Sequence, residues 1–129
     1  MDNLENTLIW AARYGYPKIV QILLESKTVD QAQALIEASR FGHFEIVQML
    51  LKAGANFQDD QALIMAAKNG YSAIVQLLLN AGSTANDKAL IEAVKNGHIV
   101  TVQLLLASGA TASSHDLNEA LTWYLKRDI

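Results

Sequence analysis

Apolar residues recur along the chain at the spacing of short amphipathic helices. Within Thr7–Tyr14, Leu8 and Ala12 fall on one helical face, while Trp10 and Tyr14 fall on roughly the opposite face. Residues three or four positions apart share a face of an α-helix. The pattern therefore predicts a helix that buries the first pair of side chains and exposes the second pair.

A second apolar stripe follows after a short break. It consists of Ile19, Val20, Leu23 and Leu24, and Gly15 stands between the two stripes. Glycine adopts the left-handed conformation that closes a helix C-terminus at the lowest cost. The two stripes therefore predict a helical hairpin whose first helix ends at the glycine.

The same hairpin pattern is repeated along the chain. Its first glycine recurs at Gly15, Gly42, Gly70 and Gly97, which are 27, 28 and 27 residues apart. Self-similarity at such a period is typical of stacked repeats rather than of one globular core. We expect a single domain over residues 1–129, with repeats at approximately 1–33, 34–61, 62–88 and 89–119 and a C-terminal capping half-repeat at 120–129.

Small residues in each first helix predict close packing between neighbouring repeats. The small pairs are Ala11–Ala12, Ala38–Ser39, Ala66–Ala67 and Ala93–Val94. In the last copy the pair becomes Tyr124–Leu125, and we expect these large side chains to cover the end of the core. An aromatic ring or imidazole precedes every second helix, which predicts a structural role at Tyr16, His43, Tyr71 and His98.

The segments between repeats contain polar residues that predict helix starts. Asp30 with Gln33, and Asp116 with Glu119, have the spacing of a capping box. Lys27 stands where later units have a second glycine, so a different ending is expected there. Strand patterns are nearly absent. The fold class that follows is an all-α solenoid of stacked antiparallel helix pairs.

Two stretches of the chain resemble a known family. The first is Ala34–His43 followed by Ile46–Ala55, and the second is Ala89–His98 followed by Val102–Ala110. Both resemble the ankyrin repeat, and the resemblance covers nearly the whole chain. It implies antiparallel helix pairs that stack into a slightly curved solenoid and bind other proteins.

The chain departs from the ankyrin pattern in the length of its repeats. Ankyrin repeats have about 33 residues, with a Thr-Pro-Leu-His tetrad and a β-turn finger. The missing residues here lie between the Gly-Ala pair and the next first helix, where the family builds that finger. We therefore expect short loops in place of the β-hairpin fingers, and partner contacts on the exposed face of the first helices.

Composition and charge exclude several classes of protein. No apolar run approaches the roughly 18–20 residues that cross a bilayer, and the acidic start Met1–Glu5 lacks the features of a secretory signal. The chain has no cysteine, and its formal net charge of −3 gives no support for binding nucleic acid. We expect neither a membrane nor a nucleic-acid partner, and a cytoplasmic location, or the interior of a host cell if the protein is delivered there.

Catalytic and cofactor motifs are absent from the sequence. It contains no glycine-rich phosphate loop, no Gly-x-Ser-x-Gly and no cysteine nucleophile. The histidines are not expected to share a helical face with carboxylates at metal-ligand spacing; they are His43, His98 and His115. We therefore expect no enzymatic activity, no cofactor and no metal site.

The exposed face of the first helices holds the candidate binding residues. A cation recurs there in every unit, so that half of the ten Lys and Arg residues form one column: Arg13, Arg40, Lys68, Lys95 and Lys126. Trp, Tyr and Arg dominate the energetics of protein interfaces. The candidate partner-binding residues are Trp10, Arg13, Tyr14, Arg40, Phe41, Met65, Lys68, Asn69, Lys95 and Asn96.

Both groups of candidates also have a structural interpretation. A cation in the last turn of a helix offsets the helix dipole and can remain solvated, which is the more common case. The position one turn before this cation lies on the same exposed face, and it holds Trp10, Glu37, Met65, Glu92 and Trp123. The two glutamates interrupt the positive field. Trp10 and Tyr14 can instead cover the open N-terminal end of the stack.

The sequence favours a non-enzymatic protein–protein interaction module whose partner is a protein or a peptide. A monomer is expected, and a homodimer through exposed aromatic residues is left open. One alternative is a designed or fragment repeat scaffold without a partner, because residues 62–79 and 89–106 agree at 12 of 18 positions. Irregular residues such as Pro17 and Lys27 argue for natural descent. The other alternative is a regulatory domain of a longer protein.

Overall fold

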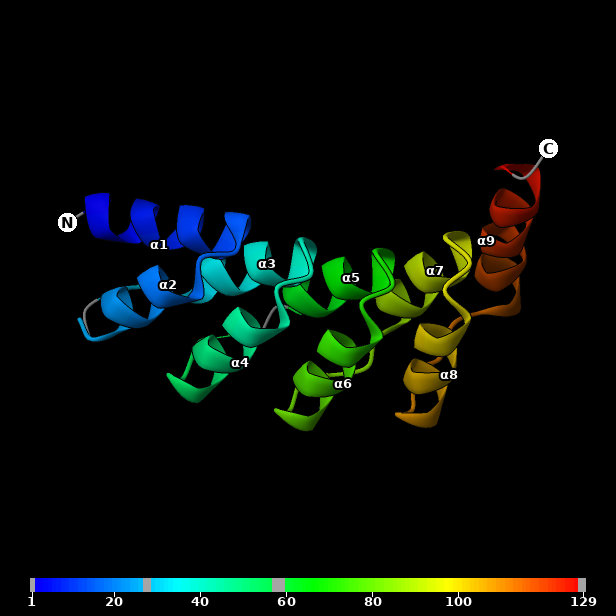
Figure 1. The fold of residues 1–129 in the computed structure, drawn as a ribbon. Coiled ribbons are helices and arrows are strands. Elements are labelled where there is room, and N and C mark those ends of the chain that lie inside the picture. Colours follow the sequence, from blue (N-terminus) through cyan, green and yellow to red (C-terminus); the bar gives the residue numbers. More distant parts are fainter. Residues whose placement is uncertain (1, 27–28, 57–59, 128–129) are drawn as a thin grey trace.

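Two rows of helices make up the computed structural model, which describes residues 2–26, 29–56 and 60–127 (Figure 1). The first helices of the hairpins form one row: α1 (Asp2–Tyr14), α3 (Ala32–Arg40), α5 (Gln61–Lys68), α7 (Asp87–Lys95) and α9 (Ser114–Arg127). The second helices form the other row: α2 (Pro17–Leu24), α4 (Phe44–Lys52), α6 (Ser72–Asn80) and α8 (Ile99–Ala107). The described residues contain no strand, which confirms the predicted all-α solenoid.

A glycine turn joins the two helices of each hairpin. Gly15 has a φ of +82°, and its amide and that of Tyr16 both donate to the carbonyl of Ala11, at 3.0 and 2.9 Å. Side chains with a Cβ rarely adopt this left-handed conformation. The predicted role of the recurring glycine, as the residue that closes the first helix, is therefore confirmed.

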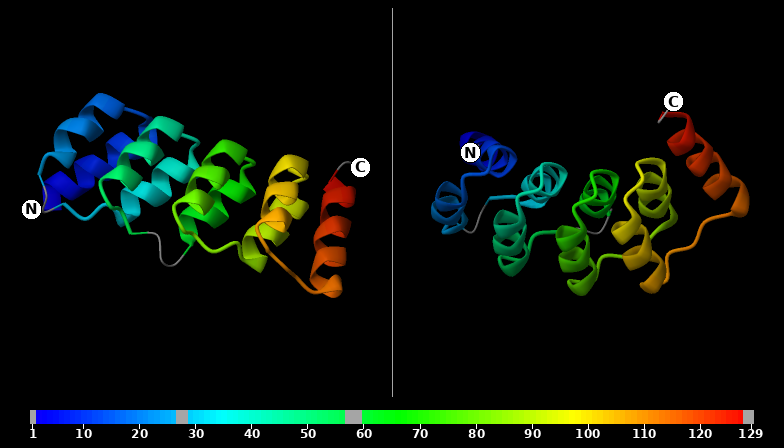
Figure 2. Two further views of the ribbon diagram at one scale, coloured as in Figure 1. Left: turned by 90° about the horizontal axis from the view of Figure 1, so that it is seen from below. Right: turned by 45° about the vertical axis from the view of Figure 1, so that its right-hand side comes forward.

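Neighbouring hairpins stack side by side, as seen from below in Figure 2. Each first helix packs on the next first helix, and each second helix on the next second helix. The small pairs lie at the first-helix contacts, and Ala12, Ala38 and Ala66 are fully buried. The core is thus a continuous layer between the two rows, including Leu8, Leu35, Leu63 and Leu90 from the first helices.

Rings that precede the second helices pack on the glycine of the preceding repeat. A Cβ on Gly70 would lie 2.5 Å from the His98 ring, and one on Gly42 would lie 2.7 Å from the Tyr71 ring. The His98 Nε2 atom is also hydrogen-bonded to the carbonyl of Lys68 at 3.1 Å. This confirms the predicted structural role for His43, Tyr71 and His98, each of which packs on a glycine of the preceding repeat. It does not confirm that role for Tyr16, which is 56% exposed.

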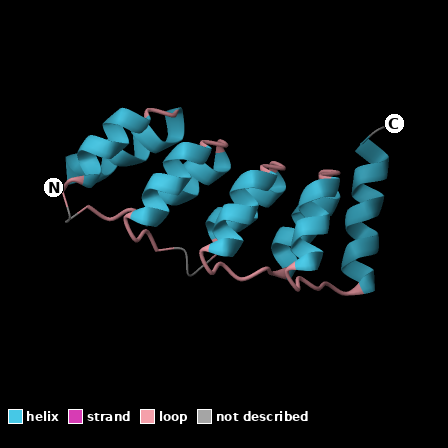
Figure 3. Cartoon of the chain, turned by 60° about the horizontal axis from the view of Figure 1, so that its bottom comes forward, coloured by secondary structure: helices cyan, strands magenta, loops and turns pink. Residues whose placement is uncertain are grey.

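The loops between repeats run along one edge of the stack (Figure 3). The two fully described loops, residues 81–86 and 108–113, contain no strand, so the projecting fingers of ankyrin repeats are absent there. One hydrogen bond joins two neighbouring loops: the hydroxyl of Ser83 donates to the carboxylate of Asp60 at 2.7 Å. The different ending expected at Lys27 lies outside the described residues.

The C-terminal unit differs from its prediction in two ways. Its helix begins at Ser114 rather than near residue 120, because the hydroxyl of Ser113 accepts a hydrogen bond from the amide of Asp116 at 3.0 Å. Tyr124 covers the glycine of the preceding repeat, as expected, with its ring against Gly97. Leu125 does not cover the core, because its side chain points away and is exposed.

Candidate functional site

The first helices line the inside of a shallow arc in Figure 1, and their outward side chains include the predicted binding residues. On α1, Trp10 and Tyr14 are exposed and their rings meet edge to face, with centroids 5.8 Å apart. The Arg13 guanidinium lies 6.0 Å from the centre of the Tyr14 ring. The predicted aromatic and cationic residues of the first unit therefore form one surface cluster.

Arg13 is held by a buried carboxylate from the next repeat. Its Nε atom donates to Glu37 Oε1 at 2.9 Å, and Gln33 Nε2 donates to Glu37 Oε2 at 3.2 Å. The side chain of Glu37 was expected to be exposed, and that prediction is wrong, since the residue is only 4% exposed. A buried carboxylate needs such partners, because leaving it unpaired carries a large desolvation cost.

In this ion pair the positive charge of Arg13 is offset by the negative charge of Glu37. The hydrogen bond to Glu37, followed by the one to Tyr14, raises the pKa of the Arg13 guanidinium above its ordinary value. Arg13 therefore stays charged at any working pH, but its charge is offset by Glu37. Arg40 approaches the same carboxylate only to 4.0 Å, and its side chain is 53% exposed.

A groove of about 560 Å³ lies between α3 and α5 and gathers half of the predicted residues. The Arg40 guanidinium lies 5.4 Å from the centre of the Phe41 ring, and Asn69 Nδ2 donates to the carbonyl of Arg40 at 2.9 Å. The walls of this α3–α5 groove include Glu37, Arg40, Phe41, Met65, Lys68 and Asn69. Apolar surface, an aromatic ring and cations thus converge at one place.

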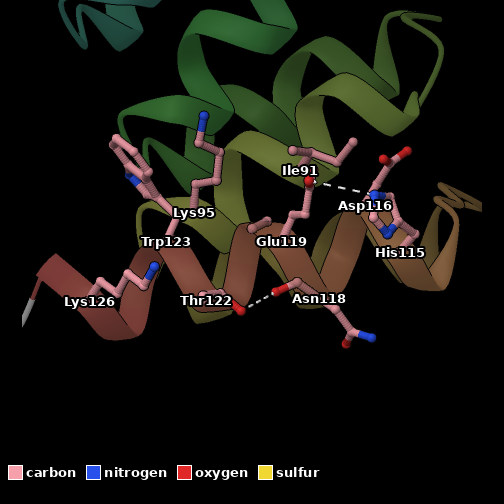
Figure 4. Close-up of a pocket in the computed structure, with 10 residues that line it drawn as sticks. Ile91, Lys95, His115, Asp116, Asn118, Glu119, Thr122, Trp123 and Lys126 are labelled. Atoms are coloured by element: carbon pink, nitrogen blue, oxygen red, sulfur yellow. Dashed lines mark hydrogen bonds and ion pairs between the residues drawn. The ribbon is translucent and has the colours of Figure 1, made fainter.

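A second groove, of about 550 Å³, lies between α7 and α9 (Figure 4). There the ammonium group of Lys95 lies 5.2 Å from the centre of the Trp123 ring. Asn96, also predicted to bind a partner, is instead occupied within the fold: it donates to the carbonyl of Glu92 at 2.8 Å and accepts from Arg127 at 3.0 Å. The structure therefore divides the predicted set among three places along the arc: the α1 cluster, the α3–α5 groove and the α7–α9 groove.

Sequence reasoning placed Trp123 and Lys126 in the exposed column but left them out of the binding set. Both line the α7–α9 groove, together with Ile91. The recurring column was the pattern that could have identified them, because it places Trp123 one repeat beyond Glu92. What the sequence could not show is that α9 packs closely enough on α7 to form a wall.

One cluster of potential metal ligands lies at the start of α9. His115, Asp116 and Glu119 offer ligand atoms within 4.8 Å of one another, so the prediction that no histidine shares a face with carboxylates is wrong here. All three side chains are at the surface of a single helix, and His115 Nε2 lies 3.5 Å from Glu119 Oε2. Proximity alone marks this cluster, and among the described residues no buried ligand from another element completes it.

Comparison with known families decides the classification. A family profile described as "Ankyrin repeats (3 copies)" matches residues 1–61 and 35–116, which is most of the chain. The chain belongs to the ankyrin-repeat family. A search of the curated proteins finds no match.

Ankyrin repeats generally act as protein–protein interaction modules, and the family is typically non-enzymatic. Among the described residues, none of the helices of this ankyrin-repeat chain is both long and apolar enough to span a membrane. Compared with the 33-residue ankyrin repeat, the repeats of this chain are shorter, at 27 or 28 residues.

Proposed function

We propose that this ankyrin-repeat chain is a non-enzymatic module that binds a partner polypeptide along the exposed face of α1, α3 and α5. The observation that carries the proposal is the run of exposed aromatic residues beside arginines, from Trp10 and Tyr14 to Phe41. Exposed clusters of this kind are uncommon on inert surfaces. Trp, Tyr and Arg are also the residue types most enriched in interface hot spots.

The rings are already held in place before a partner arrives. Trp10 and Tyr14 pack on each other, and Arg40 lies over Phe41. Ordering flexible side chains opposes association, so side chains fixed in advance lose less entropy on binding. This supports the binding role over the alternative that Trp10 and Tyr14 merely cover the end of the stack.

The charges beside these rings favour an acidic partner segment. Glu37 offsets Arg13, whereas Arg40 and Lys68 line the α3–α5 groove and are both exposed. Opposite charges at an interface raise the association rate and select among partners. The expected partner is therefore a segment that carries carboxylates next to an aromatic or aliphatic anchor.

A random peptide display library tests the proposal, because it presents segments of every composition to the exposed face at once. We expect the selected peptides to combine acidic residues with an apolar anchor and to bind more weakly as salt is raised. Phe41→Ala should weaken their binding about 30-fold, the effect of losing a hot spot worth about 2 kcal/mol.

The chain offers a matched control for this variant. Phe44, on the row of second helices, is 42% exposed, close to the 45% of Phe41. Phe44→Ala should leave peptide binding unchanged. Equal loss from both variants, or no peptides enriched over the background, would contradict the proposed face; the second result would favour a scaffold without a partner.

A further inference from the structure

The two rows of helices end at different places. The row of second helices ends at α8, whereas the row of first helices continues to α9 (Figure 1). α9 packs on α7 in the way that α7 packs on α5. Within the described part of the chain, α9 therefore has a first-helix neighbour but no second helix of its own.

Two leucines on α9 are exposed as a result. Leu121 occupies the position of Leu90 in the preceding repeat, and its exposure is 47% against 1%. Leu125 occupies the position of Val94, which is partly buried, and of Ala67, which is fully buried. In earlier repeats the second helix of the same hairpin covers these positions, and no such helix follows α9 among the described residues.

Side chains of α8 border the same place. Ile99 corresponds to Ser72, whose hydroxyl reaches the next second helix and is 2.9 Å from the hydroxyl of Thr101. Leu106 corresponds to Leu79, which is partly buried, but Leu106 is exposed. The end face is defined here as Ile99, Leu106, Leu121 and Leu125, and it continues the interface that joins one second helix to the next.

We propose that the end face binds a second copy of this chain, with α9 of each copy taking the second-helix place of the other. α9 is suited to that place because Leu121 and Leu125, four positions apart, form an exposed apolar stripe like that of a second helix. A two-fold axis lets both copies cover their end faces at once. This interface is separate from the face assigned to the partner polypeptide.

The orientation of the two α9 helices follows from the repeats and from charge. The two helices of every hairpin run antiparallel, so a helix in the second-helix place runs antiparallel to α9. Asp116 lies in the first turn of α9, and Lys126 and Arg127 lie in its last turn. Antiparallel pairing places the acidic half of one helix beside the basic half of the other, whereas parallel pairing would align like charges.

The end face is too small for a tight dimer. A standard stable interface buries about 800 Å² from each partner, which is more than four partly exposed aliphatic side chains supply. We therefore expect a weak dimer that forms between micromolar and millimolar concentrations of protein.

Cross-linking can locate the interface because the chain has no native cysteine. Leu121 lies near the middle of α9, and thus near the two-fold axis, so Leu121→Cys should form a disulfide-linked dimer readily under mild oxidation. Ile22→Cys is the matched control, because Ile22 is an exposed aliphatic residue on α2 at the other end of the stack. Ile22→Cys should cross-link at least about tenfold more slowly than Leu121→Cys, because its thiols meet only by random collision.

Sedimentation velocity over a concentration series gives the independent readout. The wild type should shift from monomer towards dimer, and the double variant Leu121→Gln, Leu125→Gln should remain monomeric with an unchanged circular dichroism spectrum, since both side chains are exposed. A monomeric wild type at millimolar concentration overturns the proposal. So does a dimer that the double variant retains, or equal cross-linking of Leu121→Cys and Ile22→Cys.

A synthetic peptide of residues 71–80, which includes the second helix α6, tests whether the end face binds a foreign helix instead of a second copy. If the peptide binds a monomeric wild type but not the double variant, the end face receives a foreign helix and the second copy is rejected. If the wild-type dimer forms and the peptide competes with it, the proposed occupant is supported.

Discussion

At the scale of single residues, the repeats differ in whether their buried hydroxyl groups have hydrogen-bond partners. Ser39 is fully buried in α3 and its hydroxyl has no hydrogen-bond partner, whereas the equivalent residues Ala12 and Ala67 carry no polar atom there. Ser72 also has a hydroxyl at a contact between repeats, but it is bonded to Thr101. An unpaired buried hydroxyl costs free energy that a paired one does not.

These two serines should therefore respond oppositely to the same substitution. Ser39→Ala should raise the free energy of unfolding by about 1 kcal/mol, because it removes the unpaired hydroxyl and alanine favours the helix. Ser72→Ala should lower it by about 1 kcal/mol, because Thr101 loses its partner. Urea denaturation of both variants measures the difference, and a destabilised Ser39→Ala protein would show that the hydroxyl is paired in solution.

At the scale of helices, the sequence predicted the elements but not the residues that begin them. The capping boxes expected at Asp30 and Asp116 do not form as such: Gln33 donates to Glu37, and α9 is capped by Ser113. The residue that starts α7 is Asn86, which accepts a hydrogen bond from the amide of Ala89 at 2.8 Å. Several polar residues stand in a row before each helix, and sequence alone does not say which of them the turn brings into place.

Adjacent residues on the terminal helix allow the role of α9 to be tested. Tyr124 packs on Gly97, whereas Leu125 is exposed. Tyr124→Ala should destabilise the docking of α9 on α7 by about 1–2 kcal/mol, because the ring contact is lost. Hydrogen exchange should then become faster over residues 114–127 while the rest of the chain keeps its protection.

Leu125→Ala is the comparison for that experiment, and it should leave the exchange of α9 nearly unchanged in dilute solution, where we expect the chain to be a monomer. If both substitutions accelerate exchange equally, the contact between the Tyr124 ring and Gly97 does not hold the helix.

At the scale of the whole molecule, the structure is a stack in which each hairpin packs mainly on its neighbours. The period of the glycines predicted this architecture, because self-similar units must bury their faces against each other. Helical spacing within each unit predicted which face of the first helices is exposed, except at Glu37. It could not predict that Glu37 turns inward to Arg13, or that Lys95 lies over Trp123, because both contacts join residues of different repeats.

The stacked arrangement makes the effect of a core substitution depend on its place along the stack. Leu8 and Leu63 occupy equivalent positions and are fully buried. Replacing either one by alanine should lower the free energy of unfolding by about 2–5 kcal/mol. Leu8→Ala should lead to local unfolding of the first hairpin, since only one neighbour holds it. Leu63→Ala should lower the stability of the hairpins on both sides.

Hydrogen exchange resolved along the chain distinguishes these outcomes. Faster exchange confined to residues 2–24 is expected for Leu8→Ala, and faster exchange over all repeats for Leu63→Ala. An identical global loss from both would show that the stack unfolds as one unit.

The ion pair between the partly exposed Arg13 and the buried Glu37 has a consequence for how the chain folds. Repeats so alike in sequence can stack in the wrong order, or exchange between molecules, at little cost in apolar contact. Among the described residues, the bonds Arg13–Glu37, Ser72–Thr101 and Ser83–Asp60 each form at a single junction. A misplaced hairpin would leave the carboxylate of Glu37 buried without its guanidinium. These polar contacts therefore distinguish the junction of the first two hairpins and that of the last two, which the repeated leucines and alanines alone cannot do.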